Sequence, residues 1–372
     1  MIHRAKFQNF KALRDVEVTF DSRLTVLVGP TGSGKTSVLQ GIQFLGLHFR
    51  TMSLPGAIEK RTARGMTAGW GWSWSDDEQY SFDQGAIGNS VVEVQGKYAG
   101  NLGVYCCVNG NAVYEPRGDG VPDRERLGSG LWRFENGEYI ATGTPLLLHL
   151  RSAQLLRLDP ARLATPSLPM KIPPEISTDG SGLPSVLLYL LRKYPEQFRS
   201  VTEALHAVVR SVEGIRLDLE PLGAQFSDTI LFDFVGAKGV RAISASDGTL
   251  FVLGLLAVVF GPDSPRLLLL DDFDHGLHPK AQMELIGVLR KLLAQFPDLQ
   301  IIATSHSPYI LDKLAWNEVR VTALNDDGSA VCKPLTDHPK YPMWKDSMSP
   351  GEFWSHGGED WVKQLTPQTA AP

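Results

Sequence analysis

The chain of 372 residues has few cysteines and no long apolar run, and both scarcities limit what it can be. Its three cysteines, Cys106, Cys107 and Cys332, lack the spacing of a metal site or a redox motif. The adjacent pair is typical of small core residues in a strand, which fits a reducing cytoplasm. The longest apolar run, 250–260, is too short to span a bilayer, and residues 1–11 are too polar for a signal segment. We therefore expect a cytoplasmic protein with no membrane partner.

An excess of positive charge is also missing. The formal net charge is -5, with 36 Lys and Arg against 41 Asp and Glu, which argues against a generally basic protein that coats DNA. A local basic groove remains compatible with this balance. Candidates for such a groove are Lys60, Arg61, Arg64, Arg117, Arg124 and Arg126, and the competing interpretation is an ordinary solvated surface.

A glycine-rich motif near the start fits the pattern G-x-x-x-x-G-K-[ST]. It comprises Gly29, Pro30, Thr31, Gly32, Ser33, Gly34, Lys35, Thr36 and Ser37. A buried strand is expected at 24–28 and an apolar helix at 37–47, which is the context that a P-loop requires. Glycines let successive backbone N–H groups face phosphate oxygens. We expect ATP to bind here, with Lys35 reaching the β- and γ-phosphates and Thr36 holding Mg²⁺.

Two further strands are expected to end in polar residues at the same sheet edge. The strand at 266–270 runs into Asp271 and Asp272, which alone is a weak signal but beside a P-loop predicts a Walker B motif. Asp271 would hold Mg²⁺ through water, and Asp272 would orient or deprotonate the attacking water. The strand at 299–304 leads to His306, which is placed to sense the γ-phosphate; a lone histidine there is otherwise a structural residue.

A third candidate site precedes the apolar helix at 250–260. Ser246, Asp247 and Gly248 fit a plain helix N-cap. They also fit an anion-binding helix N-terminus that meets a phosphate held by another subunit.

The remaining pattern predicts an α/β fold with a mostly parallel sheet, an antiparallel β subdomain and a helical insertion. Strands are expected at 2–7, 16–20, 91–94, 103–108, 112–114, 215–219 and 229–235, and helices at 183–194 and 195–212. The expected division is a split head, 1–50 with 213–335, a β-rich insertion at 51–164, a helical subdomain at 165–212 and a tail at 336–372.

Two aromatic groups have two interpretations each. Trp70, Trp72 and Trp74 would share one face of a strand, either as a base-stacking platform or, as we favour, packed on a core. The tail holds the aromatic residues Tyr341, Trp344, Phe353, Trp354 and Trp361. They suit either a docking surface for a partner or packing against the head.

The order of these motifs resembles the ABC-type ATPase heads of the RecF, SMC and OLD group, and most of all the AAA-family ATPases of bacterial anti-phage defence operons. The motifs that carry the resemblance are the P-loop, Ser246 to Leu250, the Walker B strand, Gly276 to Pro279 and the strand before His306. Residues 9–13 and 179–183 also match segments of that group.

The resemblance implies a homodimer that is held together by ATP bound between its two protomers. Ser246 and Gly248 of one protomer would cap the γ-phosphate held by Lys35 and Thr36 of the other, and residues 276–279 would cross the interface. Gln154 is the candidate Q-loop glutamine that would contact Mg²⁺ or water; an exposed polar residue is the equal alternative.

The chain departs from the group's pattern at the Walker B motif. Where the group has Asp-Glu or Glu-Glu, this chain has Asp271-Asp272, followed by Phe273, Asp274 and His275. Asp272 is one methylene shorter than glutamate, and a general base must lie within hydrogen-bond reach of its proton. We expect slow hydrolysis, or a base role shared with Asp274.

The resemblance implies an ATPase that acts as a sensor or regulator in anti-phage defence. No nuclease-like histidine cluster, second carboxylate-rich site or Toprim domain is visible in the sequence, so the effector nuclease is expected to be a separate protein. The alternative is a RecF-like DNA-repair ATPase that binds DNA directly. A transporter ATPase fits the 51–212 insertion and the Ser-Asp-Gly signature poorly.

Overall fold

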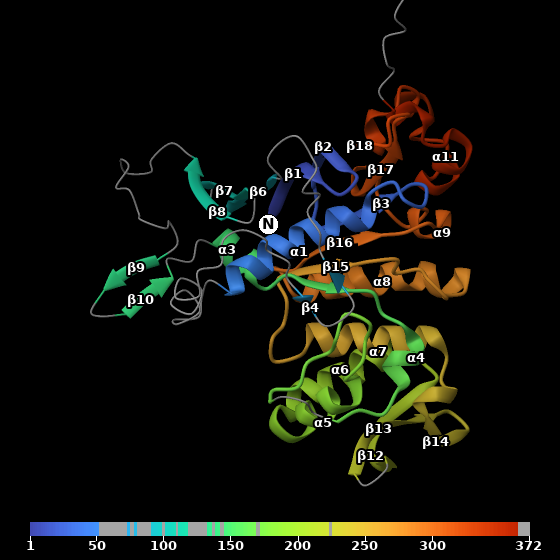
Figure 1. Ribbon diagram of the computed structural model, residues 1–372. Coiled ribbons are helices and arrows are strands. Elements are labelled where there is room, and N and C mark those ends of the chain that lie inside the picture. The colour runs from blue at the N-terminus through green and yellow to red at the C-terminus, as the bar shows by residue number, and fades with distance from the viewer. Residues whose placement is uncertain are drawn as a thin grey trace, which may run out of the picture.

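The computed structural model describes residues 1–51, 145–168, 172–222 and 225–363, and between 51 and 145 it describes the strands alone. The chain forms an upper part built on a parallel sheet and a lower part of helices and a small antiparallel sheet (Figure 1). None of the helices in these described ranges combines the length and the apolar composition that a membrane crossing requires.

A six-stranded sheet forms the centre of the upper part, in the order β11-β15-β16-β3-β17-β18. All neighbouring pairs are parallel except β17 and β18. The strands are β11 (Gln154–Leu156), β15 (Leu267–Leu270), β16 (Gln300–Thr304), β3 (Leu24–Val28), β17 (Val319–Leu324) and β18 (Ala330–Pro334). The prediction of a mostly parallel sheet is therefore confirmed, and the carboxyl ends of β3, β15 and β16 meet at one edge.

Helices cover both faces of this sheet, and the alternation of side chains along β15 explains why. Leu267 and Leu269 join the core beneath α1 (Lys35–Thr51), whereas Leu268 and Leu270 join the larger core of α7 (Asp247–Val259) and α8 (Pro279–Gln295). A strand that is buried on both faces reads as a continuous apolar run, as residues 267–270 do. Two short helices, α3 (Pro145–Arg151) and α9 (Pro308–Leu311), complete these layers.

Three strands of the β-rich segment join the antiparallel pair at the start of the chain. The strands β6 (Val91–Tyr98), β7 (Asn101–Val108) and β8 (Asn111–Arg117) extend the antiparallel pair β1 (Ile2–Phe10) and β2 (Leu13–Thr19) in the order β2-β1-β6-β7-β8. Four short strands, β4 (Ser73–Trp74), β5 (Glu78–Gln79), β9 (Trp132–Glu135) and β10 (Glu138–Ala141), form two separate pairs. Trp70 and Trp72 lie outside the described residues.

The strands expected at 215–219 and 229–235 exist, but they are not part of the parallel sheet. They form β12 (Val212–Leu222) and β13 (Gln225–Phe234), which pair antiparallel with each other and with β14 (Ala237–Arg241). Only two residues connect β12 to β13, and a parallel pair needs a crossover of a dozen or more residues. This sheet packs with α5 (Leu183–Lys193) and α6 (Pro195–Val208) in the lower part, where α4 (Pro160–Ala164) packs with α5 and α7 (Figure 1).

The C-terminal aromatic residues mostly pack against the head. Phe353 of α11 (Pro350–Gly357) is buried, and its ring lies 5.1 Å from that of Trp316. Trp354 and Trp361 pack against the larger core. Packing is thus confirmed for these three residues, while Trp344, at the end of α10 (Tyr341–Trp344), stays 38% exposed.

Candidate nucleotide-binding site

The P-loop joins β3 to α1 and lies against β17. Gly29 has a φ of 144°, and a Cβ atom there would lie 2.2 Å from the carbonyl oxygen of Thr322. Only glycine fits this position, because any side chain would collide with the backbone of β17. The hydroxyl groups of Ser33 and Thr322, 2.6 Å apart, hold the loop to the same strand.

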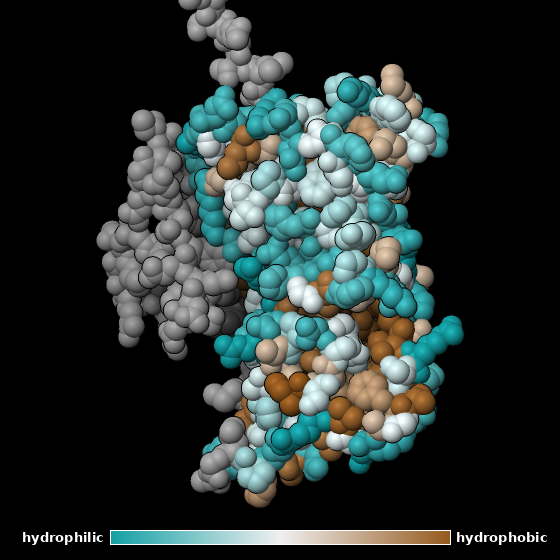
Figure 2. All heavy atoms as spheres, turned by 90° about the vertical axis from the view of Figure 1, so that its right-hand side faces the viewer, coloured by the Kyte–Doolittle hydropathy of each residue, from teal (hydrophilic) through white to brown (hydrophobic). Residues whose placement is uncertain are grey.

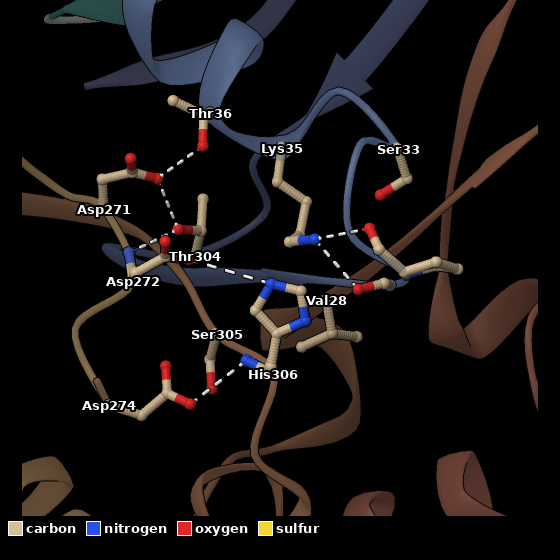
Figure 3. A network of polar contacts seen from close by, with 12 residues as sticks. Val28, Ser33, Lys35, Thr36, Asp271, Asp272, Asp274, Thr304, Ser305 and His306 are labelled. Atoms are coloured by element: carbon tan, nitrogen blue, oxygen red, sulfur yellow. Dashed lines mark hydrogen bonds and ion pairs between the residues drawn. The ribbon is translucent and has the colours of Figure 1, made fainter. Parts of the chain in front are cut away.

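Lys35 lies folded over this loop. Its Nζ donates hydrogen bonds to the carbonyl oxygens of Gly29 at 2.9 Å and Pro30 at 2.8 Å (Figure 3). Burial lowers the pKa of Lys35, and the charges of Asp272 and then Asp271 oppose this effect. The ammonium group of Lys35 thus lies against the P-loop, on the side of the sheet edge that carries Asp271 and Asp272.

The first Walker B acid, Asp271, is the centre of a hydroxyl–carboxylate group. Its Oδ1 accepts hydrogen bonds from Thr36 Oγ1 at 2.9 Å and from Thr304 Oγ1 at 2.8 Å (Figure 3). Burial raises the pKa of Asp271, while the hydrogen bonds from Thr304 and Thr36 oppose that effect. A hydroxyl and a carboxylate are oxygen ligands of the kind that Mg²⁺ takes beside nucleotide phosphates, so the residues fit this ion. Thr304, at the end of β16, is a site residue that the sequence analysis missed.

Asp272 has a backbone that few residues other than glycine adopt. Its φ is 46°, in the left-handed region, which a short polar side chain such as aspartate tolerates better than most. Its N–H donates to Thr304 Oγ1 at 2.8 Å. One carboxylate oxygen lies 3.1 Å from the guanidinium of Arg157, and the other lies 3.8 Å from Nε2 of His306. The structure therefore brings the second Walker B acid and His306 together, as expected.

A second network ties the turn after the Walker B acids to the end of β16. Asp274 Oδ2 accepts the backbone N–H of His306 at 3.2 Å. Gln282 of α8 donates to the carbonyl oxygens of Asp274 at 3.2 Å and Leu277 at 2.9 Å, and it accepts from Ser307 Oγ at 2.6 Å. Gln282 thus links Leu277, in the segment 276–279, to Ser307, which directly follows His306. The sequence analysis did not identify Gln282, because it lies in α8 three residues beyond the segment 276–279 and belongs to no motif.

Gln154 does not join this group. It begins β11, where its register partner is Leu268, three residues before Asp271. The carboxyl end of β11 lies beside Asp271, whose N–H donates to Leu156 O at 2.8 Å. Arg157 follows directly and reaches Asp272. The edge of the site next to β11 is therefore occupied by Arg157 and not by Gln154, which the sequence could have indicated only if the short strand 154–156 had been recognised.

Ser246 caps the N-terminus of α7. Its Oγ accepts from the N–H of Thr249 at 3.2 Å, which confirms the N-cap interpretation. Ser246 and Asp247 are exposed, and within the described ranges no hydrogen bond joins them to the P-loop. They belong to the lower part of the molecule, where β14 leads into α7, whereas Lys35 belongs to the upper part (Figure 1).

Two family profiles match the chain. An AAA-domain family whose description also names the AbiEii toxin and type IV TA systems matches residues 156–312, and a second AAA-domain family matches residues 4–55. Together these two ranges contain the P-loop, the N-cap of α7, the Walker B strand and His306.

Relatives and one solved structure agree with these profiles. The Septu protein PtuA of Bacillus mycoides is 24% identical over 348 residues, covering 88% of this chain. The DNA replication and repair protein RecF of Geobacter metallireducens is 34% identical over 71 residues, covering 18% of this chain and 20% of the relative. A crystal structure of an SMC head bound to the C-terminal winged-helix domain of ScpA superposes with a TM-score of 0.53 at 15% identity, covering 89% of this chain and 96% of that one. This likeness shows the fold, and the chain spans only 41% of the length of the PtuA relative.

Proposed function

Taking the chain as an ABC-type ATPase of the RecF and SMC kind, we propose that it binds and hydrolyses ATP with Mg²⁺ in a site completed by a second copy. The observation that carries this proposal is the group of Lys35, Thr36, Asp271, Thr304 and Asp272 at one sheet edge (Figure 3). Each of these residues has the chemistry that its role requires.

The upper part supplies the chemistry. Lys35 exchanges its two carbonyl partners for β- and γ-phosphate oxygens, and the P-loop N–H groups cradle the same phosphates. Thr36 and Asp271 would hold Mg²⁺, which when bound would neutralise charge on the phosphates. Asp272 accepts a proton from the attacking water, and His306, whose Nε2 lies 3.8 Å from one Asp272 carboxylate oxygen, faces the γ-phosphate.

The lower part supplies the opposite wall of the site. Ser246, Asp247 and Gly248 present the N-terminus of α7, a buried helix of 13 residues, to solvent. Such an N-terminus attracts anions. Ile243, three residues before Ser246, is 68% exposed. Figure 2 shows apolar patches over the lower part of the molecule, on the side that faces right in Figure 1, and such patches are typical of surfaces that a partner covers. The γ-phosphate of a partner subunit is the proposed occupant, so the functional unit is a homodimer.

Light scattering with and without ATP and Mg²⁺ tests this proposal. Asp272→Asn should slow turnover by roughly a hundredfold or more and accumulate an ATP-bound dimer, because the water loses its proton acceptor. Ser246→Arg should abolish the dimer and leave ATP binding by the monomer unchanged. Ser264→Arg, at an exposed serine in the loop before β15, is the matched control and should dimerise normally. Unchanged turnover in Asp272→Asn or Asp272→Ala would contradict the role of Asp272.

The biological role that we propose is regulation in anti-phage defence, together with a separately encoded effector nuclease. The PtuA relative, which matches over most of this chain, supports this assignment. Pull-down with the product of the neighbouring gene, with and without ATP, is the test. A complex that forms only with ATP is expected, and no complex in either state would argue against a separate effector.

A RecF-like DNA-repair ATPase is the second candidate, and the match to RecF favours it. Of its candidate phosphate contacts, Arg117 ends β8 and the other five lie outside the described residues. Binding to duplex DNA that weakens steeply with salt would support this function. No binding at low salt would rule it out.

A further inference from the structure

Arg157 is a cation at the site that has no role in the proposed hydrolysis. Arg157 follows β11, and its guanidinium lies 3.1 Å from Oδ2 of Asp272. It reaches that carboxylate from the edge strand β11, which β15 and β16 separate from the P-loop strand β3. The charge of Asp272 also acts on Lys35, where it opposes the lowering of the lysine pKa by burial.

The ion pair between Arg157 and Asp272 is poorly shielded from water. The Arg157 side chain is 63% exposed and that of Asp272 is 24% exposed. Exposed pairs of this kind contribute little to stability and exchange partners readily. A phosphate group carries more negative charge than a carboxylate and offers the planar guanidinium two acceptor oxygens at once. A terminal phosphate placed between Lys35 and Asp272 would therefore attract Arg157 more strongly than Asp272 does.

We infer that Arg157 is a γ-phosphate ligand of its own protomer, held on Asp272 until ATP arrives. This inference rests on the proposed function. ADP ends at the β-phosphate and does not displace the pair. When Arg157 moves to the γ-phosphate, Asp272 Oδ2 becomes available to the attacking water while His306 remains beside Oδ1. Arg157 thus occupies the place that the sequence analysis assigned to Gln154.

Calorimetric titration with ADP and with a non-hydrolysable ATP analogue tests this inference. Arg157→Gln should weaken binding of the analogue by about tenfold or more and leave ADP affinity within about twofold, because a charge-assisted hydrogen bond to the third phosphate alone is lost. The matched control is Arg162→Gln in α4, where the arginine is 62% exposed and pairs with Asp179 at 3.7 Å. This control should bind both nucleotides as the wild-type chain does.

A second measurement distinguishes a phosphate ligand from a structural ion pair. Asp272→Asn should strengthen analogue binding several-fold by releasing Arg157, and it should do so much less when Arg157 is already glutamine. The titrations are repeated in Ser246→Arg, so that dimerisation does not contribute to the measured affinities.

The outcomes separate the inference from the function on which it rests. Equal affinity of Arg157→Gln and wild type for the analogue would overturn the inference, as would an equal loss for ADP and the analogue. If Asp272→Asn changes the affinity for the analogue equally with arginine and with glutamine at position 157, Arg157 does not move from Asp272 to the γ-phosphate. A wild-type chain that binds neither nucleotide would overturn the proposed function itself.

Discussion

At the scale of single residues, Thr304 determines how both Walker B acids are presented. Its hydroxyl donates to Asp271 Oδ1 and accepts from the N–H of Asp272. It is completely buried, so water cannot replace either bond. One hydroxyl therefore fixes the carboxylate for Mg²⁺ and the strained backbone of the residue proposed as the base.

Substitution of Thr304 by Val should weaken Mg²⁺-dependent ATP binding and lower the free energy of unfolding by about 1–3 kcal/mol, because a buried acceptor and a buried donor lose their partner. Thr25→Val in β3 is the matched control. Its hydroxyl is equally buried and has no hydrogen-bond partner in the described part of the chain, so the change should be neutral or stabilising. Denaturant unfolding and nucleotide titration check both variants, and equal effects of the two would contradict this role for Thr304.

His149 illustrates how burial can make one residue sensitive to acid. The ring lies 3.1 Å from Gln300 Oε1, and Gln300 also bonds the backbone of Ile2, so α3, β1 and β16 meet here. Burial, aided by the N-terminal amine, lowers the pKa of His149 to about 3. Below pH 6.5 the unfolded chain therefore binds a proton at His149 that the folded chain does not bind. The free energy of unfolding falls as the pH falls.

Lowering the pH from 7.5 to 5.5 should lower the free energy of unfolding of the wild-type chain by about 1.4 kcal/mol through His149. His149→Gln should remove that part of the pH dependence, because its amide can still donate to Gln300 but does not titrate. His356→Gln, at an exposed position of α11, should retain it. Urea unfolding at the two pH values is the measurement, and parallel losses in the wild type and His149→Gln would refute this explanation.

At the scale of elements, α1 must approach α3 closely in order to carry the P-loop on the sheet. A Cβ atom on Gly46 of α1 would lie 2.3 Å from the carbonyl oxygen of Leu150. That contact requires glycine, although glycine weakens a helix interior. Glycine at position 46 therefore lowers the intrinsic stability of the helix that carries Lys35 and Thr36, but it allows this helix to lie close to α3.

Two glycine substitutions in helices should have opposite signs. Gly46→Ala should lower the free energy of unfolding by about 1–3 kcal/mol, since backbone has to move. Gly287→Ala in α8, where nothing lies within 4 Å of the new methyl group, should raise it by about 0.5–1 kcal/mol. Thermal unfolding of both variants is the check, and stabilisation by Gly46→Ala would contradict the close approach.

Local pattern was enough to predict the elements that carry the site, but not their partners. The apolar strands at 24–28, 267–270 and 300–304 and the two motif helices follow from short-range sequence signals. The pairing of β6 with β1 joins residues about ninety positions apart, and no local pattern specifies it. The three-residue strand β11 is too short for a periodicity, so the sequence does not indicate that Arg157 follows the end of a strand, and the resemblance alone suggests Gln154.

At the scale of the whole molecule, the two halves of the proposed site lie in different parts of the chain. The P-loop and Walker B acids belong to the parallel sheet, and Ser246 belongs to the helix above the lower antiparallel sheet (Figure 1). The segment 276–279 and Gln282 link the Walker B strand to α8, which packs against α7 between these parts. In the proposed homodimer, twofold symmetry makes the two composite sites equivalent, each with Lys35 of one chain and Ser246 of the other.

Complementation between two defective variants tests this composite site most directly. Lys35→Ala lacks the phosphate ligand and Ser246→Arg lacks the capping serine, so neither should associate with itself in ATP. A mixture should associate when ATP is added, because the heterodimer contains one site with Lys35 from one chain and Ser246 from the other. Energy transfer between donor-labelled Lys35→Ala and acceptor-labelled Ser246→Arg measures this. The proposed composite site predicts an ATP-dependent signal in the mixture and none with either variant by itself. No signal in the mixture, with a normal ATP-dependent signal in labelled wild type, would contradict it.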